Sequence, residues 1–241
     1  MPNVFITGSG RRIGKALAMK FADKGYDVAV HYNNSREGAE DAASQIRAMG
    51  RSASVVTGDV RSEDQMRSAL TRAATELGGI DVLVNNAGVF PPPTPISELS
   101  VEEWDRVLNI NLRGEMICSK IFAGMAVDGA RIINFASLGA LEIWKHRIQY
   151  NVSKAGVVQL TRALARELAP RISVNCVAPG AILVPDEPNI HESEMAPARK
   201  IPMNRYGTPD DIFDAVYFFA TCSSYITGQT IAVDGGYHYA H

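Results

Sequence analysis

The chain has few cysteines and almost no net charge. Only three of its 241 residues are cysteine, and 24 basic residues stand against 26 acidic ones. An odd number of widely spaced cysteines (Cys118, Cys176 and Cys222) favours free thiols in a reducing compartment, so we expect a cytoplasmic protein. The balanced charge argues against nucleic acid as a partner.

Long apolar runs and metal-binding patterns are also missing. No apolar run approaches the roughly 20 residues that span a bilayer, and no basic, apolar leader precedes the first expected strand. We therefore expect neither a membrane segment nor a signal peptide. The histidines show no metal-ligand spacing, so we expect no metal site. A chain of this length can form one domain that buries most of its apolar surface.

Two residues that are present, Tyr150 and Lys154, say most about function. Four positions apart on an expected helix, they share one face. A neighbouring ammonium favours the phenolate, which suits a tyrosine for acid–base catalysis near neutral pH. Ser137 follows a strand-like run at 132–136 and could hydrogen-bond the oxygen on which the phenol acts. The pair alone is weak support, because this spacing arises by chance on many amphipathic helices.

A glycine-rich turn follows the first expected strand at 3–6. The turn at 7–14, TGSGRRIG, leads into an amphipathic helix at 13–22. Glycines let the backbone approach a pyrophosphate, and free N–H groups at the helix N-terminus point at it. A second strand at 27–32 and a helix at about 37–49 complete a βαβ nucleotide-binding unit.

Strands and helices keep alternating along the rest of the chain. Besides the helix of Tyr150, we expect strands at 53–57, 82–84, 132–136, 172–177 and 230–233, and helices at about 62–77, 101–125 and 209–220. Seven strands alternating with helices predict an α/β fold, a doubly wound, Rossmann-type parallel sheet in a single domain spanning 1–241. The one long irregular stretch, at about 180–206, is rich in proline and is expected to form a substrate loop or lid.

Taken together, these motifs resemble the short-chain dehydrogenase/reductase family over the whole chain. The matching motifs are the turn at 7–14, Gly58-Asp59-Val60, Asn85-Asn86-Ala87-Gly88, Asn111, Ser137, Tyr150 with Lys154, and Pro179-Gly180. The resemblance implies an oxidoreductase with Tyr150 as general acid/base and Ser137 binding the substrate oxygen. It also implies that Lys154 holds the nicotinamide ribose and that Asn111 supports a proton relay. The implied assembly is a homotetramer joined through the helices of Asn111 and Tyr150.

The resemblance further implies a nicotinamide cofactor site at the carboxyl ends of the strands. The residues expected to form it are Gly8, Gly10, Arg11, Arg12, Ile13, Gly14, His31, Asn33, Ser35, Arg36, Asp59, Val60, Asn86, Ala87, Gly88, Tyr150, Lys154, Pro179, Gly180 and Ile182.

The stretch at 31–36, after the second strand, contains no acidic residue. NAD enzymes of this fold place an acid there, which accepts a hydrogen bond from the ribose 2′-hydroxyl. Instead Arg11, Arg12, Ser35 and Arg36 could gather round a 2′-phosphate, which guanidinium groups bind strongly. We therefore expect NADPH in preference to NAD, with reduction as the natural direction. The alternative is that these arginines are solvated surface residues.

Arg12 replaces the family's usual middle glycine of the turn, and Phe90 follows Gly88 closely. Both features resemble the pteridine-reductase branch, which implies that Phe90 stacks on a pterin and binds substrate together with Ser137 and Tyr150. Pteridine reductases, however, carry an aspartate in place of Ser137 and a serine in place of Gly88.

The predicted function is therefore NADPH-dependent reduction of a C=O or C=N bond by hydride transfer, with Tyr150 as proton donor and a pterin as one substrate class. The first alternative is a carbonyl reductase acting on a 3-oxoacyl thioester or a small ketone. The second is a non-catalytic NADPH-binding regulator, which the intact Ser137, Tyr150 and Lys154 disfavour. NAD-linked oxidation of an alcohol is disfavoured by the missing acid.

Overall fold

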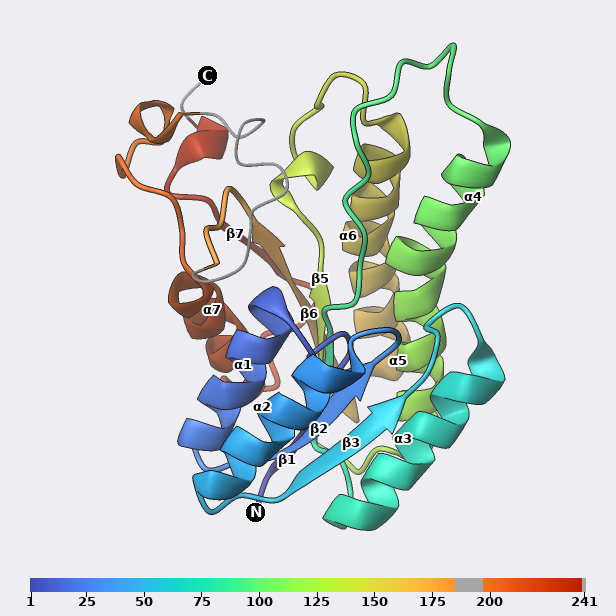
Figure 1. The fold of residues 1–241 in the computed structure, drawn as a ribbon, viewed down its shortest axis with the longest axis vertical. Coiled ribbons are helices and arrows are strands. Elements are labelled where there is room, and N and C mark those ends of the chain that lie inside the picture. Colours follow the sequence, from blue (N-terminus) through green and yellow to red (C-terminus); the bar gives the residue numbers. More distant parts are fainter. Residues whose placement is uncertain (185–196, 240–241) are drawn as a thin grey trace.

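The computed structural model describes residues 1–184 and 197–239, and a seven-stranded sheet forms its centre (Figure 1). The strand order is β3-β2-β1-β4-β5-β6-β7, and every neighbouring pair is parallel. The strands are β1 Asn3–Ile6, β2 Asp27–Tyr32, β3 Ala53–Thr57, β4 Val82–Asn85, β5 Ala130–Phe135, β6 Ile172–Pro179 and β7 Thr230–Val233. The predicted Rossmann-type parallel sheet is confirmed. Of the lid predicted at about 180–206, residues 185–196 lie outside the described residues.

Helices cover both faces of the sheet (Figure 1). One layer consists of α1 Arg12–Asp23, α2 Arg36–Ala48 and α7 Pro209–Thr221. The other consists of α3 Glu63–Leu77, α5 Gly114–Met125 and α6 Ile148–Leu168, with α4 Val101–Leu108 leading into α5. Because both faces are covered, the central strands read as nearly continuous apolar runs.

Neighbouring residues of one strand serve two separate apolar cores. In β1, Val4 and Ile6 join the core beneath α1, α2 and α7, whereas Phe5 joins the core beneath α3, α5 and α6. This follows from the alternation of side chains along a strand. In the first core Phe21 of α1 packs edge-to-face on Phe213 of α7, with ring centroids 5.3 Å apart. The two cores hold the ends of the strands in fixed relative positions.

The helix predicted at 101–125 is interrupted in the structure. After α4 the residues Asn109–Arg113 form a π-helical turn, and α5 begins at Gly114. Inserting such a turn shifts the register of a helix and often occurs at functional sites. Here it carries Asn111, whose side chain is completely buried. Apolar periodicity does not reveal an inserted residue, and so the sequence predicted a single helix.

The start of α1 differs from the starts of α3, α4 and α7. Ser62, Ser100 and Thr208 each cap their helix by accepting a hydrogen bond from a backbone N–H of the first turn. Within the described part of the chain, Arg11 at the start of α1 makes no such side-chain cap bond. The start of α1 follows directly on the glycine turn.

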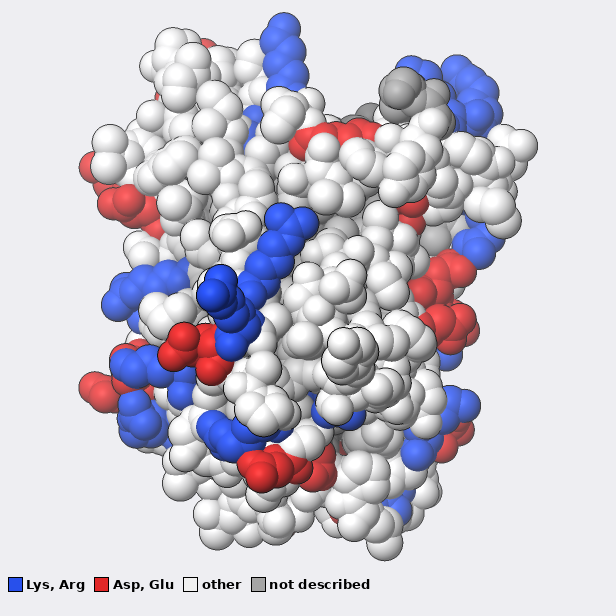
Figure 2. All heavy atoms as spheres, turned by 180° about the vertical axis from the view of Figure 1, so that it is seen from behind, with Lys and Arg blue, Asp and Glu red and all other residues white. Residues whose placement is uncertain are grey.

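The back of the molecule carries Lys, Arg, Asp and Glu side chains of both signs around a broad uncharged area (Figure 2). Among the described helices, none is long and apolar enough to cross a membrane. Nor do the described residues gather three or more His, Cys, Asp or Glu side chains into a metal-binding group.

Candidate active site

A cleft of about 1130 Å³ lies at the carboxyl ends of the strands. It opens where the strand order reverses beside β1 and β4, the usual ligand position in sheets of this kind. All predicted cofactor residues except Arg36 line it, as do the predicted substrate residues Phe90, Ser137 and Tyr150. The fold thus brings together motifs that are distributed over most of the chain.

The glycine turn is held against the segment that follows β4. Thr7 Oγ1 accepts hydrogen bonds from the backbone N–H groups of Asn86 and Ala87, both at 2.9 Å. Asn86 Nδ2 returns a bond of 2.8 Å to Thr7 O. Gly8 has φ +67°, and a Cβ on Gly14 would lie 2.3 Å from Gly8 O. Both glycines are therefore required by the turn itself.

His31, predicted to contact the cofactor, is tied to the turn and to the end of β3. His31 is 1 % exposed. The Gly8 N–H donates to Nδ1 at 3.1 Å, and Nε2 lies 3.0 Å from Gly58 O. These partners require a neutral ring with its proton on Nε2. Burial lowers the pKa of His31 to about 4, which keeps the ring neutral.

Arg12 stands in backbone geometry that favours glycine. Its φ is +51°, in the left-handed region, which explains why the family usually has glycine here. Arg11, Arg12, Asn33 and Ser35 line the cleft, whereas Arg36 does not. Arg36 opens α2 and borders a separate hollow beside the edge strand β3. The sequence alone could not show that Arg36 borders this hollow while its neighbour Ser35 lines the cleft.

Asp59 and Val60, which are predicted to bind the cofactor, line the cleft after β3. Hydrogen bonds from Arg61 to Asp59, the shortest 2.6 Å, hold the pKa of the Asp59 carboxyl below its usual range. Val60 packs so closely on α5 that a Cβ on Gly114 would lie 2.9 Å from Val60 Cγ2. The nucleotide side of the cleft is thus anchored to the helix that follows Asn111.

Ser137, Tyr150 and Lys154 meet at the end of β5. Ser137 follows that strand, and its Oγ accepts a hydrogen bond of 3.2 Å from Gly139 N. Tyr150 and Lys154 lie one turn apart on α6 and are 9 % and 5 % exposed. Lys154 Nζ donates to the backbone carbonyl of Phe135, two residues before Ser137. The phenol, the hydroxyl and the ammonium therefore border one small region of the cleft.

Asn111 lies behind this region and does not line the cleft. Its Oδ1 accepts from Val89 N at 2.8 Å, and its Nδ2 donates to Val89 O at 2.9 Å and to Ser153 Oγ at 3.2 Å. A Cβ on Gly88 would lie 3.3 Å from Asn111 Oδ1 and 3.7 Å from Lys154 Nζ. Glycine at position 88 therefore leaves room between the asparagine and the lysine.

An aromatic wall, formed by Phe90, Trp144 and Tyr150, borders the reaction end of the cleft. The Phe90 and Tyr150 centroids are 4.7 Å apart with nearly perpendicular rings, and Trp144 lies parallel to Tyr150 at 6.0 Å. The guanidinium of buried Arg147 lies 3.9 Å from the centre of the Phe90 ring and donates to Pro91 O. Phe90 was among the substrate residues expected from the sequence, whereas Trp144 and Arg147 were not among the expected site residues.

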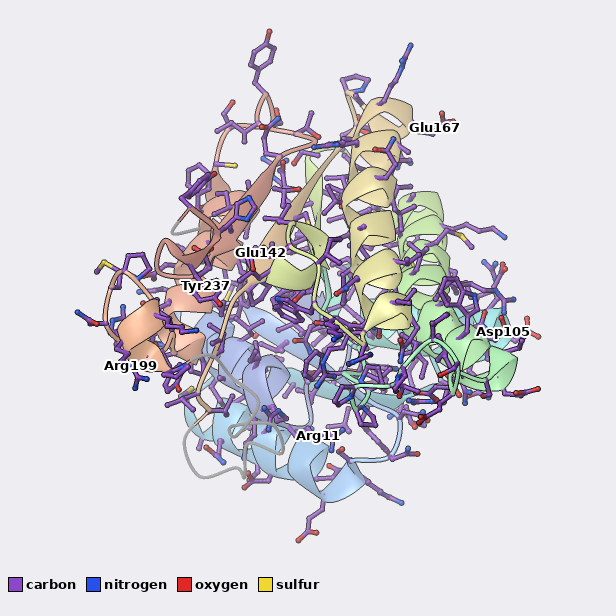
Figure 3. All side chains as sticks on the ribbon, turned by 90° about the horizontal axis from the view of Figure 1, so that it is seen from above. Arg11, Asp105, Glu142, Glu167, Arg199 and Tyr237 are labelled. Atoms are coloured by element: carbon purple, nitrogen blue, oxygen red, sulfur yellow. The ribbon has the colours of Figure 1, made fainter. Side chains whose placement is uncertain are left out.

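The C-terminal region also reaches the cleft. Tyr237 lines it, and Figure 3 shows Tyr237 and Glu142 close together, with Arg11 farther off at the start of α1. His238 Nδ1 lies 3.6 Å from Glu142 Oε1, which links this end of the chain to the segment after Ser137. No motif marks Tyr237, because its place depends on the return of the chain after β7.

Glu115 is a further residue that sequence reasoning did not single out. It lies in the first turn of α5, is 3 % exposed, and places Oε1 3.4 Å from Lys154 Nζ. Burial raises the pKa of Glu115 to about 8 despite the nearby ammonium. The residues around Glu115, Arg113-Gly114-Glu115-Met116-Ile117, contain no motif that marks a buried carboxyl group.

Comparison with known proteins identifies the family. A family described as enoyl-(acyl carrier protein) reductase matches residues 8–238. The 3beta-hydroxysteroid dehydrogenase 1 of Eggerthella lenta is 37% identical over 97% of this chain and 92% of its own, and a 3-oxoacyl-(acyl-carrier-protein) reductase of Staphylococcus epidermidis is 36% identical over 97% and 98%.

Among solved structures, a short chain dehydrogenase from Burkholderia cenocepacia in complex with NADP has a TM-score of 0.90 and 33% identity, covering 98% of this chain and 97% of that one. Coverage of this extent leaves no major element of the fold unmatched. The chain belongs to the short-chain dehydrogenase/reductase family and is an oxidoreductase.

Proposed function

We propose that the protein reduces a ketone to a secondary alcohol with NADPH. One observation carries the proposal: a single cleft has a glycine turn and the helix start that follows it at one end and Ser137, Tyr150 and Lys154 at the other. The names of the relatives from Eggerthella and Staphylococcus support a carbonyl or the corresponding alcohol as the reacting group.

The residues of the cleft fit a dinucleotide. A Cβ on Gly10 would lie 2.7 Å from Ser35 O and one on Gly14 2.3 Å from Gly8 O, so the close packing of the turn requires glycine at both positions. Both glycines line the cleft, where a pyrophosphate is expected to approach the backbone. The absence of an acid after β2, and the presence of Arg11, Arg12 and Ser35, favour a cofactor with a 2′-phosphate. When bound, NADPH would supply the hydride for the carbonyl carbon.

Residues of the chain itself supply the proton and stabilise the group that donates it. Ser137 Oγ donates a hydrogen bond to the carbonyl oxygen, and the Tyr150 hydroxyl delivers the proton to that oxygen. Lys154 stabilises the phenolate that remains. Asn111 lies behind Gly88 and connects this group to the backbone of Val89, and we propose that it supports reprotonation. The hydride and the proton together complete the alcohol.

Reduction of a flat heterocycle such as a dihydropterin is a second candidate. It is favoured by the aromatic wall, because the face of Phe90 and the parallel pair Trp144 and Tyr150 suit a planar ring. It is disfavoured by Ser137, because a serine delivers protons to ring nitrogens less readily than the aspartate of pteridine reductases.

We also propose a homotetramer joined through the helices that contain or follow Asn111 and Tyr150. Four large apolar side chains of α5 and α6 are exposed in the isolated chain, namely Met116, Met125, Ile148 and Val152. Burying them between copies would remove apolar surface from water. Sedimentation velocity of the purified protein tests this, and a monomer would contradict it.

The function is tested by following NADPH consumption with four substrate classes. These are a 3-oxoacyl thioester, a 3-ketosteroid, an aliphatic diketone and a dihydropterin, each with Tyr150→Phe as the matched control. Turnover of at least one carbonyl that is lost in Tyr150→Phe supports ketone reduction. Turnover of the pterin alone would favour the second candidate, and no turnover of any class would contradict both.

A further inference from the structure

Glu115 and Lys154 form a buried ionisable pair that the proposed reaction does not yet use. The carboxylate comes from α5 and the ammonium from α6, with 3.4 Å between Oε1 and Nζ. The two residues are 3 % and 5 % exposed. Lys154 Nζ also donates to Phe135 O, so the pair lies directly behind the end of β5 and next to Ser137.

The two helices are fixed to the sheet around this pair. Asn85 Nδ2 of β4 donates to Ser119 Oγ of α5 at 3.0 Å and to Asn134 Oδ1 of β5 at 2.9 Å. Asn134 Nδ2 in turn donates to Thr161 Oγ1 of α6 at 2.9 Å. These buried bonds connect α5 and α6 through two strands. The separation between Glu115 and Lys154 is therefore set by the fold and not by two mobile side chains.

Burial disfavours the ionised form of the Glu115 carboxyl group, and its contacts only partly offset this effect. Among the described residues, Glu115 Oε2 has no hydrogen-bond partner, and burial raises the pKa of Glu115 to about 8. The other titratable groups that interact with it are Cys118 on its own helix and Cys176 on β6, and burial raises the pKa of both thiols. Around neutral pH, then, Lys154 is the only charge that faces Glu115 from the described elements.

We infer that Glu115 is a positioning residue for Lys154. Glu115 holds the Lys154 ammonium against the carbonyl of Phe135, and once Glu115 is ionised its negative charge offsets the effect of the ammonium on Tyr150. The inference rests on the proposed function, because it concerns the proton that Tyr150 donates. A carboxylate beside the lysine weakens the attraction between the ammonium and the phenolate. The phenol therefore keeps its proton to a higher pH, and reduction, which needs that proton, continues into the alkaline range.

The test is the pH dependence of carbonyl reduction by the holoenzyme. Glutamine has the shape of the protonated carboxyl but cannot ionise, so Glu115→Gln should match wild type below about pH 7. Above that, the reductase activity of Glu115→Gln should fall to half at a pH about one unit lower than in wild type. A cofactor deuterated at the transferred position confirms, through an isotope effect, that the chemical step limits the rate.

Two variants separate charge from packing. Cys118→Ala removes buried volume one turn along α5 without changing any charge near neutral pH, and it should leave the half-activity pH unchanged. Glu115→Asp restores a carboxylate and should bring that pH back toward wild type. An unchanged profile in Glu115→Gln, or a uniform loss of rate with an unchanged midpoint, would show a merely structural role and overturn the inference.

Two further measurements remain informative if catalysis or folding fails. If no carbonyl is reduced by wild type, the proposed function fails, and tyrosinate formation followed by ultraviolet absorbance, with Tyr150→Phe subtracted, still tests the inference. Phenolate should then appear at lower pH in Glu115→Gln, and identical titrations would overturn it. If Glu115→Gln does not fold, the same titration compares wild type with Glu115→Asp, and the shorter carboxylate should move the midpoint to lower pH by less than one unit. Identical midpoints would count against the inference.

Discussion

The two ends of the cleft are built in different ways. At the nucleotide end most partners are backbone groups: the Thr7 hydroxyl and the His31 ring hold the turn to the ends of β3 and β4 through hydrogen bonds with backbone N–H and C=O groups. At the reaction end single side-chain atoms matter, namely the hydroxyls of Ser137 and Tyr150. A substitution at the first end should change affinity or stability by degrees, whereas one at the second end should stop the reaction.

The sharpest test of this difference is Tyr150→Phe. Removing the hydroxyl deletes the proposed proton donor but keeps the ring that packs on Phe90 and Trp144. We expect kcat to fall by about 10² to 10⁴-fold, the usual contribution of general acid–base catalysis, with the Kd for NADPH nearly unchanged. Steady-state kinetics and a fluorescence titration measure the two. A variant that keeps more than about a tenth of the wild-type rate would contradict the assignment.

Lys154→Ala provides the contrast at the same end. Because the lysine is proposed both to hold the ribose and to stabilise the phenolate, kcat and cofactor affinity should fall together. If kcat falls while the affinity for the cofactor stays unchanged, Lys154 does not hold the ribose.

The next largest effect concerns acid stability and His31. The native pKa of His31 is lowered to about 4, whereas an unfolded histidine titrates near about 6.5. At pH values above the pKa of the unfolded histidine, the neutral His31 ring makes its full contribution to the free energy of unfolding. As pH falls from about 6.5 to about 4 the unfolded chain gains a proton that the native state excludes, which lowers the free energy of unfolding by about 3 kcal/mol.

Urea unfolding at several pH values measures this loss in wild type and in His31→Gln. The glutamine can offer one acceptor and one donor but does not titrate, so its stability should depend less on pH over the same range. Equal pH dependence in the two proteins would mean that His31 does not remain neutral in the native state. His146 is less buried than His31 and supplies a control through His146→Gln, for which we expect little change.

How far the sequence predicted these two ends depends on what kind of signal each residue gives. The strand–turn–helix at 3–22 and the spacing of Tyr150 and Lys154 are local patterns, and the structure places both at the cleft. The aromatic wall and Glu115 depend on contacts between distant segments, which no local pattern encodes. Arg36 was predicted to join Arg11, Arg12 and Ser35 round a 2′-phosphate, but at the start of α2 it borders the hollow beside β3 and does not line the cleft.

At the nucleotide end, Arg12 allows strain and charge to be separated. Arg12→Gly removes both the guanidinium and the cost of φ +51°, whereas Arg12→Ala removes only the guanidinium. Both should lose most of a preference for NADPH over NADH of about tenfold, or about 1.4 kcal/mol. Only the glycine variant should gain stability, by up to about 1 kcal/mol.

Fluorescence titrations with each cofactor and urea unfolding of the free protein measure the two effects independently. Equal affinity of wild type for NADPH and NADH would refute the cofactor proposal. A stability gain of the same size in Arg12→Ala would show that the left-handed backbone is not the source of the strain.

The smallest effect should come from substitutions in the aromatic wall at the reaction end. They show whether the cleft favours a flat substrate over a flexible one. Phe90 contacts both Arg147 and Tyr150, and a planar ring stacked on Phe90 would gain about 0.5–1.5 kcal/mol beyond simple burial. If a dihydropterin is turned over, Phe90→Ala should raise its KM several-fold. Phe90→Leu keeps apolar bulk but no flat face, so it should raise that KM nearly as much. Neither variant should change the KM of an aliphatic diketone, which gains nothing from stacking. An equal rise for both substrates would mean that Phe90 only shapes the pocket, and would leave ketone reduction as the better-supported reaction.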